Sequence, residues 1–171
     1  MKVVRVCTHH KHKHEAAEAF IKDNVVAVGF VYDRNDALNA SKDQIKQKRL
    51  DERPYETEKQ AARAASDFCR FRDEIKPGFI VIAYEGDNTV AAIGKINDSF
   101  DFNDRNATGN PNGPLYYTNQ FPVKWERSHR FFNRSELVPE LDYWVAIPGT
   151  IYIKKDFEVD SIDELFNSSR K

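Results

Sequence analysis

The sequence predicts an α+β fold built as a small curled mixed β-barrel flanked by helices. Segments rich in Val, Ile and aromatic residues outnumber the segments with helical periodicity. The helical segments stand between the early strands and at the end, without the regular alternation of a doubly wound parallel sheet. At 171 residues the chain can bury one core, so we expect a single domain over residues 1–171.

The first part of the chain predicts a strand, a helix and a second strand. "KVVRVC" is the strand and "KHEAAEAFIKDN" the helix. In the following "VVAVGFVYD", strand alternation places Val26, Val28, Phe30 and Tyr32 on one face. Two aromatic rings are therefore expected side by side at one edge.

Capping-box patterns predict where three helices begin. Ser41 with Gln44, Thr57 with Gln60, and Ser161 with Glu164 place helix starts near 42, 58 and 162. The helix from 58 carries one apolar stripe and ends at "KPG". The stripe consists of Ala61, Ala64, Phe68, Phe71 and Ile75.

The remaining strands are predicted after this helix. "FIVIAYEGDNTVAAIGKI" is expected to form a buried hairpin, because both runs are apolar and "EGDN" favours a turn. Residues 97–114 are rich in Asn, Asp, Gly and Pro, which predicts a long loop. Trp125 and Trp144 are assigned to the core. The further strands expected are "LYYTN", "FPVKWERS", "DYWVAIP" and "TIYIKKD".

Charge and composition exclude several classes of protein. The net charge of -1 gives no sign of a nucleic-acid or membrane partner for the chain as a whole. The stretch "KWERSHRFFNR" nevertheless forms a local basic patch. Two cysteines are too few for a disulfide framework, and no apolar run has the length of a membrane span. We expect a cytoplasmic protein without a membrane partner.

Several of these segments, taken in order, resemble the EVE domain. They are "AFIKDNVVAVGF", "SKDQIK", "FRDEIKPGFIVIAYEGDNTVAAIGKI", "FPVKWE" and a late "IP". EVE domains are similar to YTH domains and share the PUA-like fold. The resemblance runs from about Val3 to Ile153, and it is closest to the DNA-reading domain at the N-terminus of some McrB-type restriction GTPases.

The resemblance implies a binding module for a modified base in double-stranded DNA, flipped into an aromatic pocket. N6-methyladenine is the favoured mark; 5-methylcytosine or a modified base in RNA are the alternatives. The chain has no G-x-x-x-x-G-K-[ST] motif, so we expect no enzyme activity and no cofactor here. The AAA+ GTPase motor and its nuclease partner are expected downstream, in a longer protein.

The resemblance also places the pocket residues. Phe30 falls near a cage tryptophan of the YTH-like pattern, and the second wall comes from the segment after the hairpin. Base-edge readers follow the first strand. The predicted base-binding pocket therefore comprises Thr8, His9, Phe30, Tyr32, Asp33, Phe100, Tyr116 and Tyr117, with Phe102 as a further candidate for the second wall.

Cationic side chains are expected to contact the DNA backbone, which positions the protein without reading sequence. Arg127 and Arg130 alternate with aromatic residues in a pattern common to nucleic-acid grooves and equally to edge strands. The predicted set comprises Lys11, Lys13, Arg34, Lys124, Arg127, Arg130 and Arg134.

The stretch "CTHHKHKHE" leaves three interpretations open. His10 and His14, four residues apart, offer two metal ligands on one helix face, but no second ligand cluster is visible. A polar, basic DNA-contacting arm is the interpretation we favour over a zinc site or a solvated helix start. A metal-dependent hydrolase remains the competing function, and its candidate residues are His9, His10, His12, His14 and Asp33.

Overall fold

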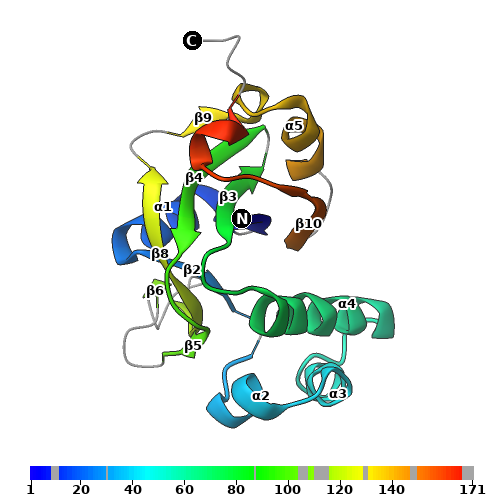
Figure 1. The fold of residues 1–171 in the computed structure, drawn as a ribbon. Coiled ribbons are helices and arrows are strands. Elements are labelled where there is room, and N and C mark those ends of the chain that lie inside the picture. Colours follow the sequence, from blue (N-terminus) through cyan, green and yellow to red (C-terminus); the bar gives the residue numbers. More distant parts are fainter. Residues whose placement is uncertain are drawn as a thin grey trace.

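A strongly curled half-barrel sheet flanked by helices forms the body of the molecule (Figure 1). The computed structural model describes residues 1–8, 12–29, 31–86, 88–103, 108–109, 116–128, 131–146 and 150–166. The main sheet has the strand order β10-β1-β3-β4-β8-β2, with β5 paired to β8 and β9 paired to β4. The predicted α+β class is confirmed at this level.

The strands lie where the sequence predicts most of them. They are β1 (Lys2–Cys7), β2 (Val25–Val28), β3 (Ile80–Gly86), β4 (Thr89–Ile96), β5 (Asp101–Phe102), β6 (Thr108–Gly109), β7 (Tyr116–Tyr117), β8 (Asn119–Arg127), β9 (Phe132–Asn133) and β10 (Ile151–Glu158). β1 runs parallel to β3 and antiparallel to β10. The β3–β4 hairpin is antiparallel, as predicted.

The helices cover the sheet and its lower edge (Figure 1). They are α1 (Lys13–Asp23), α2 (Arg34–Asn39), α3 (Lys42–Glu52), α4 (Glu58–Cys69) and α5 (Pro139–Val145), with a π-helical turn η1 (Arg70–Glu74) and 3₁₀ turns η2 (Arg134–Glu136) and η3 (Ile162–Leu165). Both capping boxes predicted for α3 and α4 form. The helix expected from 162 is a single 3₁₀ turn.

β8 bends the sheet because its two halves have different neighbours. Its first residues pair with β2 on one edge and with β5 on the other. Its later residues pair with β4 instead, across a register shift between Ile93 and Gly94. A shift of this kind increases local twist, which curls the sheet towards closure.

Apolar side chains fill both sides of the sheet. On one side Phe20 of α1, Phe68 and Phe71 pack with Phe121 of β8. On the other side α5 and η3 cover the sheet with residues that include Leu141. Trp144 is 7% exposed and belongs to the core as predicted. Trp125 is partly buried: it packs against the first cluster and donates its indole N–H to the carbonyl of Phe20 at 3.1 Å.

Three predictions of local structure are wrong. The strand expected to run through Tyr32 ends at Val28, because Asp33 caps a helix that was not predicted, α2. Within "DYWVAIP", residues 142–145 form the end of α5, since Pro139 at the first helical position starts a helix there. The predicted loop at 97–114 contains the short strands β5 and β6.

No helix in the described ranges has both the length and the apolar character needed to cross a bilayer.

Candidate functional site

A buried amide holds the backbone turn that follows β2. Asn119, the first residue of β8, is fully buried and donates its Nδ2 to the carbonyls of Val28 at 3.2 Å and Val31 at 2.6 Å. Thr118 Oγ1 donates to the same carbonyl of Val31 at 3.4 Å. Hydrogen bonds between uncharged groups are stronger in the protein interior than in water, so these bonds hold the turn between Val28 and Val31 firmly.

Gly29 lies inside that turn, where two tyrosine side chains approach the backbone. A Cβ atom at Gly29 would lie 3.0 Å from Cδ1 of Tyr117 and 3.2 Å from the hydroxyl oxygen of Tyr32. The carbonyl oxygen of Tyr116 would be 3.3 Å away. A side chain at Gly29 would crowd this convergence, and the tyrosine side chains would have to shift by a few tenths of an ångström.

Tyr117 connects the turn to the end of β1. Its hydroxyl donates to the carbonyl of Thr8 at 3.4 Å, and its ring packs edge-on against Phe20, with centroids 5.4 Å apart. Burial raises the pKa of the Tyr117 hydroxyl far above its usual value. Thr8 is itself fixed, because its hydroxyl donates to the Lys13 carbonyl and its N–H to the Tyr84 carbonyl.

The structure thus brings three predicted pocket residues to one place, although they are distant in sequence. Thr8 and Tyr117 form the buried side of this junction, and Tyr32 is the exposed ring at 52%. We call the residues Thr8, Gly29, Tyr32 and Tyr117 the tyrosine junction. An exposed aromatic face supported by buried neighbours is able to stack on a planar ligand.

The other predicted pocket residues differ in their surroundings. Asp33 caps α2, with one carboxylate oxygen accepting from the Asp36 N–H at 3.0 Å. Phe100 packs edge-on against Phe121 and two further core rings, and Tyr116 belongs to β7 and is half-buried. Phe102, the further candidate for the second wall, is buried. His9 and Phe30 lie outside the described residues.

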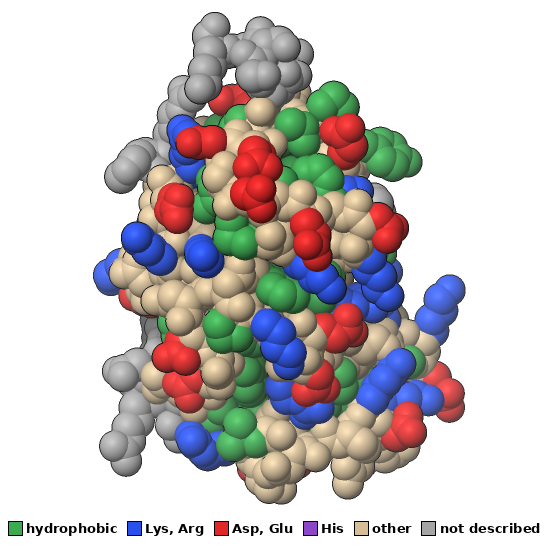
Figure 2. All heavy atoms as spheres, viewed as in Figure 1, with side chains coloured by type: hydrophobic (Ala, Val, Ile, Leu, Met, Phe, Trp, Pro, Cys, Tyr) green, Lys and Arg blue, Asp and Glu red, His purple; other side chains and the backbone are tan. Residues whose placement is uncertain are grey.

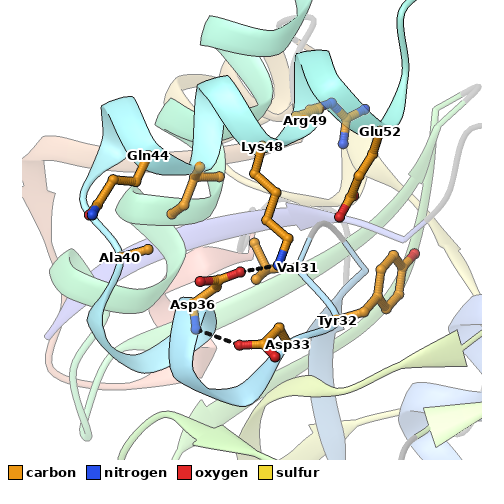
Figure 3. Close-up of a pocket in the computed structure, with 10 residues that line it drawn as sticks. Val31, Tyr32, Asp33, Asp36, Ala40, Gln44, Lys48, Arg49 and Glu52 are labelled. Carbon is orange, nitrogen blue, oxygen red and sulfur yellow. Dashed lines mark hydrogen bonds and ion pairs between the residues drawn. The ribbon is translucent and has the colours of Figure 1, made fainter.

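A cavity of about 280 Å³ opens beside Tyr32, between α2 and α3 (Figure 3). This volume is near the lower end of the range for small-ligand sites. Its apolar floor comes from Val31, Ala40 and Ile45, and the ammonium of Lys48 bonds to the carboxylate of Asp36 across it. The full lining is Val31, Tyr32, Asp33, Asp36, Ala40, Gln44, Ile45, Lys48, Arg49 and Glu52.

Sequence reasoning found Tyr32 and Asp33 but missed the rest of this cavity. The helix α2 was not predicted, although Asp33 could have indicated where it starts. Asp is favoured at the N-cap of a helix because its carboxylate oxygen accepts from a backbone N–H that has no partner within the helix. Arg72 then holds α2 in place, donating to the carbonyls of Ala37 at 3.3 Å and Ala40 at 2.9 Å.

The predicted backbone-contact residues fall into two groups. Three arginines are engaged within the protein: Arg34 with the Phe102 carbonyl, Arg127 with Asp163 and the Phe166 ring, and Arg134 with Asn88 and Asp142. Lys124 is exposed on β8, and Lys13 begins α1. Lys11 and Arg130 lie outside the described residues. Basic and acidic side chains are interspersed over much of the face in Figure 2.

The family of the chain follows from a match over most of its length. A family model described as a domain of unknown function, DUF8426, matches residues 5–140. The chain belongs to this family. The match begins in β1 and ends within α5, so the tyrosine junction and the cavity beside it both lie inside the DUF8426 domain. No curated protein matches the chain.

Within this DUF8426 domain, the histidine stretch does not form a metal site among the described residues. No three His, Cys, Asp or Glu side chains of the described ranges converge to hold an ion. His14 instead lies between two carboxylates, with Nδ1 3.0 Å from Glu85 and Nε2 3.3 Å from Glu18. Its ring packs 4.5 Å from Phe131. His9 and His10 lie outside the described residues.

Proposed function

We propose that this domain binds a modified base of double-stranded DNA, with N6-methyladenine as the favoured mark, after the base is flipped out of its helix. The observation that carries the proposal is the tyrosine junction, where an exposed ring stands on a rigid support drawn from three distant segments. The half-barrel flanked by helices is compatible with the PUA-like fold of EVE domains. We further propose that the domain is the specificity module of an McrB-type restriction GTPase, with motor and nuclease on other parts of the system.

Stacking has to offset the cost of extruding a base. Flipping costs a few kcal/mol, and stacking on an aromatic face returns about 1–3 kcal/mol per base. Tyr32 is the exposed ring of the junction, whereas Tyr117 is 6% exposed and supports the wall from behind. Phe30, two residues before Tyr32 in the sequence, is the proposed second stacking face.

Selectivity for the mark needs a polar partner as well as an apolar one. One methyl group contributes only about 1–3 kcal/mol in an apolar pocket, so the remaining N6 hydrogen must also be satisfied. Asp33 is adjacent to Tyr32 at the same end of the cavity (Figure 3). One of its oxygens caps α2, and we propose that the other accepts from the methylated amine.

The test is fluorescence anisotropy with matched duplexes that carry adenine, N6-methyladenine or 5-methylcytosine at one position. We expect the N6-methyladenine duplex to bind most tightly to the wild type. Tyr32→Ala should weaken this binding by about 10- to 100-fold, the equivalent of one lost stack. Tyr55→Ala is the matched control, because Tyr55 is 78% exposed and lies outside both the junction and the cavity.

Asp33→Asn tests the polar reader separately. Asn remains a good N-cap, so α2 is kept, but its amide nitrogen would face the N6 hydrogen with a donor instead of an acceptor. The preference for N6-methyladenine over 5-methylcytosine should therefore shrink. Equal binding of all duplexes by the wild type would refute the proposal, and preference for 5-methylcytosine or for a methylated RNA strand would reassign the ligand.

A further inference from the structure

A β-bulge sets two lysines side by side on the sheet. The register of β4 against β8 shifts between Ile93 and Gly94. A Cβ atom at Gly94 would lie 2.6 Å from the carbonyl oxygen of Lys124, so only glycine allows the strands to approach this closely. Directly after the bulge, Lys95 stands opposite Lys124. Bulges re-aim side chains, and here the consequence is a like-charge pair.

Both ammonium groups point away from the core. The next pair in register, Ile96 with Val123, is buried, and side chains alternate between faces along a strand. Lys95 and Lys124 are accordingly exposed.

The pair is unfavourable in the protein alone. Residues directly opposite in an antiparallel pair have Cβ atoms about 4.5–5.5 Å apart, and like charges carried by such residues are destabilising. Within the described part of the chain, no hydrogen bond or ion pair joins either lysine to an acidic side chain. One anion between the two ammonium groups would convert the repulsion into two attractions.

The position of the pair relative to the tyrosine junction indicates which anion this is. Asn119, which holds the turn beside the junction, and Lys124 lie on the same strand, five residues apart. Five residues of strand span about 17 Å, which equals the axial rise of about five base pairs of a duplex. The pair is too distant for the extruded nucleotide itself and is within reach of its flanking backbone.

We propose that Lys95 and Lys124 act as one site that binds a single backbone phosphate of the duplex flanking the extruded base. This inference rests on the proposed function. Lys95 was not recognised in the sequence, because its partner across the sheet lies 29 residues away in the chain. Arg127 and Arg134, nearer to the C-terminus of the same basic segment, already have partners inside the protein.

The experiment measures how the affinity for a 20-base-pair duplex falls with salt, for the wild type, Lys95→Gln, Lys124→Gln and the double variant. Each phosphate neutralised contributes about 0.9 to the slope of log affinity against log salt. A shared phosphate predicts that either single variant lowers the slope by up to about 0.9 and that the double variant lowers it no further. Lys59→Gln, an exposed lysine of α4, is the matched control and should leave the slope unchanged.

The outcomes separate this inference from the proposed function. If both single variants lower the slope and the double variant adds their effects, the lysines bind separate phosphates and the single site is wrong. If the wild type prefers the modified duplex but no variant changes its slope, the inference fails while the proposed function stands. If the wild type binds no duplex, both fail. Thermal midpoints equal to or above that of the wild type would exclude misfolding as the cause of a change.

Discussion

Replacing Gly94 with Ala should destabilise the domain more than any other glycine-to-alanine change described here. The new Cβ would lie 2.6 Å from the carbonyl oxygen of Lys124, 2.7 Å from Cγ1 of Val123 and 2.8 Å from Cε3 of Trp125. The carbonyl belongs to the sheet backbone, and Trp125 is tied to α1 through its indole N–H, so neither can yield without breaking other contacts. Overpacking of a core typically costs about 1–3 kcal/mol, and backbone involvement places this case near 3 kcal/mol.

The effect is measurable by urea unfolding followed by circular dichroism. For a domain of this size, about 3 kcal/mol corresponds to a fall in the melting temperature of about 6–12 °C. Gly29→Ala is the matched comparison, because its closest contacts are side-chain atoms of Tyr117 and Tyr32 at 3.0 and 3.2 Å, which can shift. Gly29→Ala should lower the free energy of unfolding by less than Gly94→Ala does, but it should weaken binding of the modified duplex. A loss below about 1 kcal/mol for Gly94→Ala would refute the reasoning.

Two further predictions concern the pH dependence of stability, and a third concerns the hydrogen bonds from Arg72 to the end of α2. Burial raises the pKa of Tyr117, so the native state keeps the hydroxyl proton at pH values where the unfolded state loses it. The free energy of unfolding should therefore fall as pH rises above about 10, the usual pKa of tyrosine. In Tyr117→Phe this fall should be absent when unfolding is measured as a function of pH. The pKa of Glu56 is lowered by its two bonds from Arg49, so the stability it contributes is present above the usual pKa of a glutamate and is lost as pH falls through the lower native value. Glu56→Gln should therefore cost about 1 kcal/mol at pH 7 and almost nothing near pH 2, by urea titration at both values; an equal cost at both would contradict the assignment. Arg72→Gln should cost about 1.5–3 kcal/mol, because two carbonyls at the end of α2 lose a charged donor, and it should loosen hydrogen-exchange protection in α2 before the sheet.

Local patterns were sufficient for the elements that depend on neighbouring residues. The capping boxes at Ser41 and Thr57 form as predicted, because a side chain and a backbone N–H three residues apart decide them. The β3–β4 hairpin follows from two apolar runs around one turn. "DYWVAIP" was misassigned because its strand-like residues were given more weight than Pro139 at the start of the helix.

The candidate site could be anticipated only in part. Tyr32 and Tyr117 were named from the sequence, but the strand that was expected to carry Tyr32 ends at Val28. Its actual placement depends on Asn119, a buried amide that holds the turn from 88 and 91 residues away in the chain. Propensity and periodicity contain no term for such contacts.

By itself, the sequence determined the mixed fold class, the capped starts of α3 and α4, the central hairpin and the burial of Trp144 in the core. These depend on interactions within a few residues or on the burial preference of single side chains. Only the tertiary structure showed that two tyrosine side chains approach Gly29 and that Lys95 lies opposite Lys124. It also showed that Arg127 and Arg134 form hydrogen bonds within the protein. The Lys95–Lys124 pair depends on the register between β4 and β8, where a shift of one residue would turn the same side chains to the opposite face. The contacts at Gly29 and the partners of the two arginines depend on how separate segments pack, which local patterns do not describe.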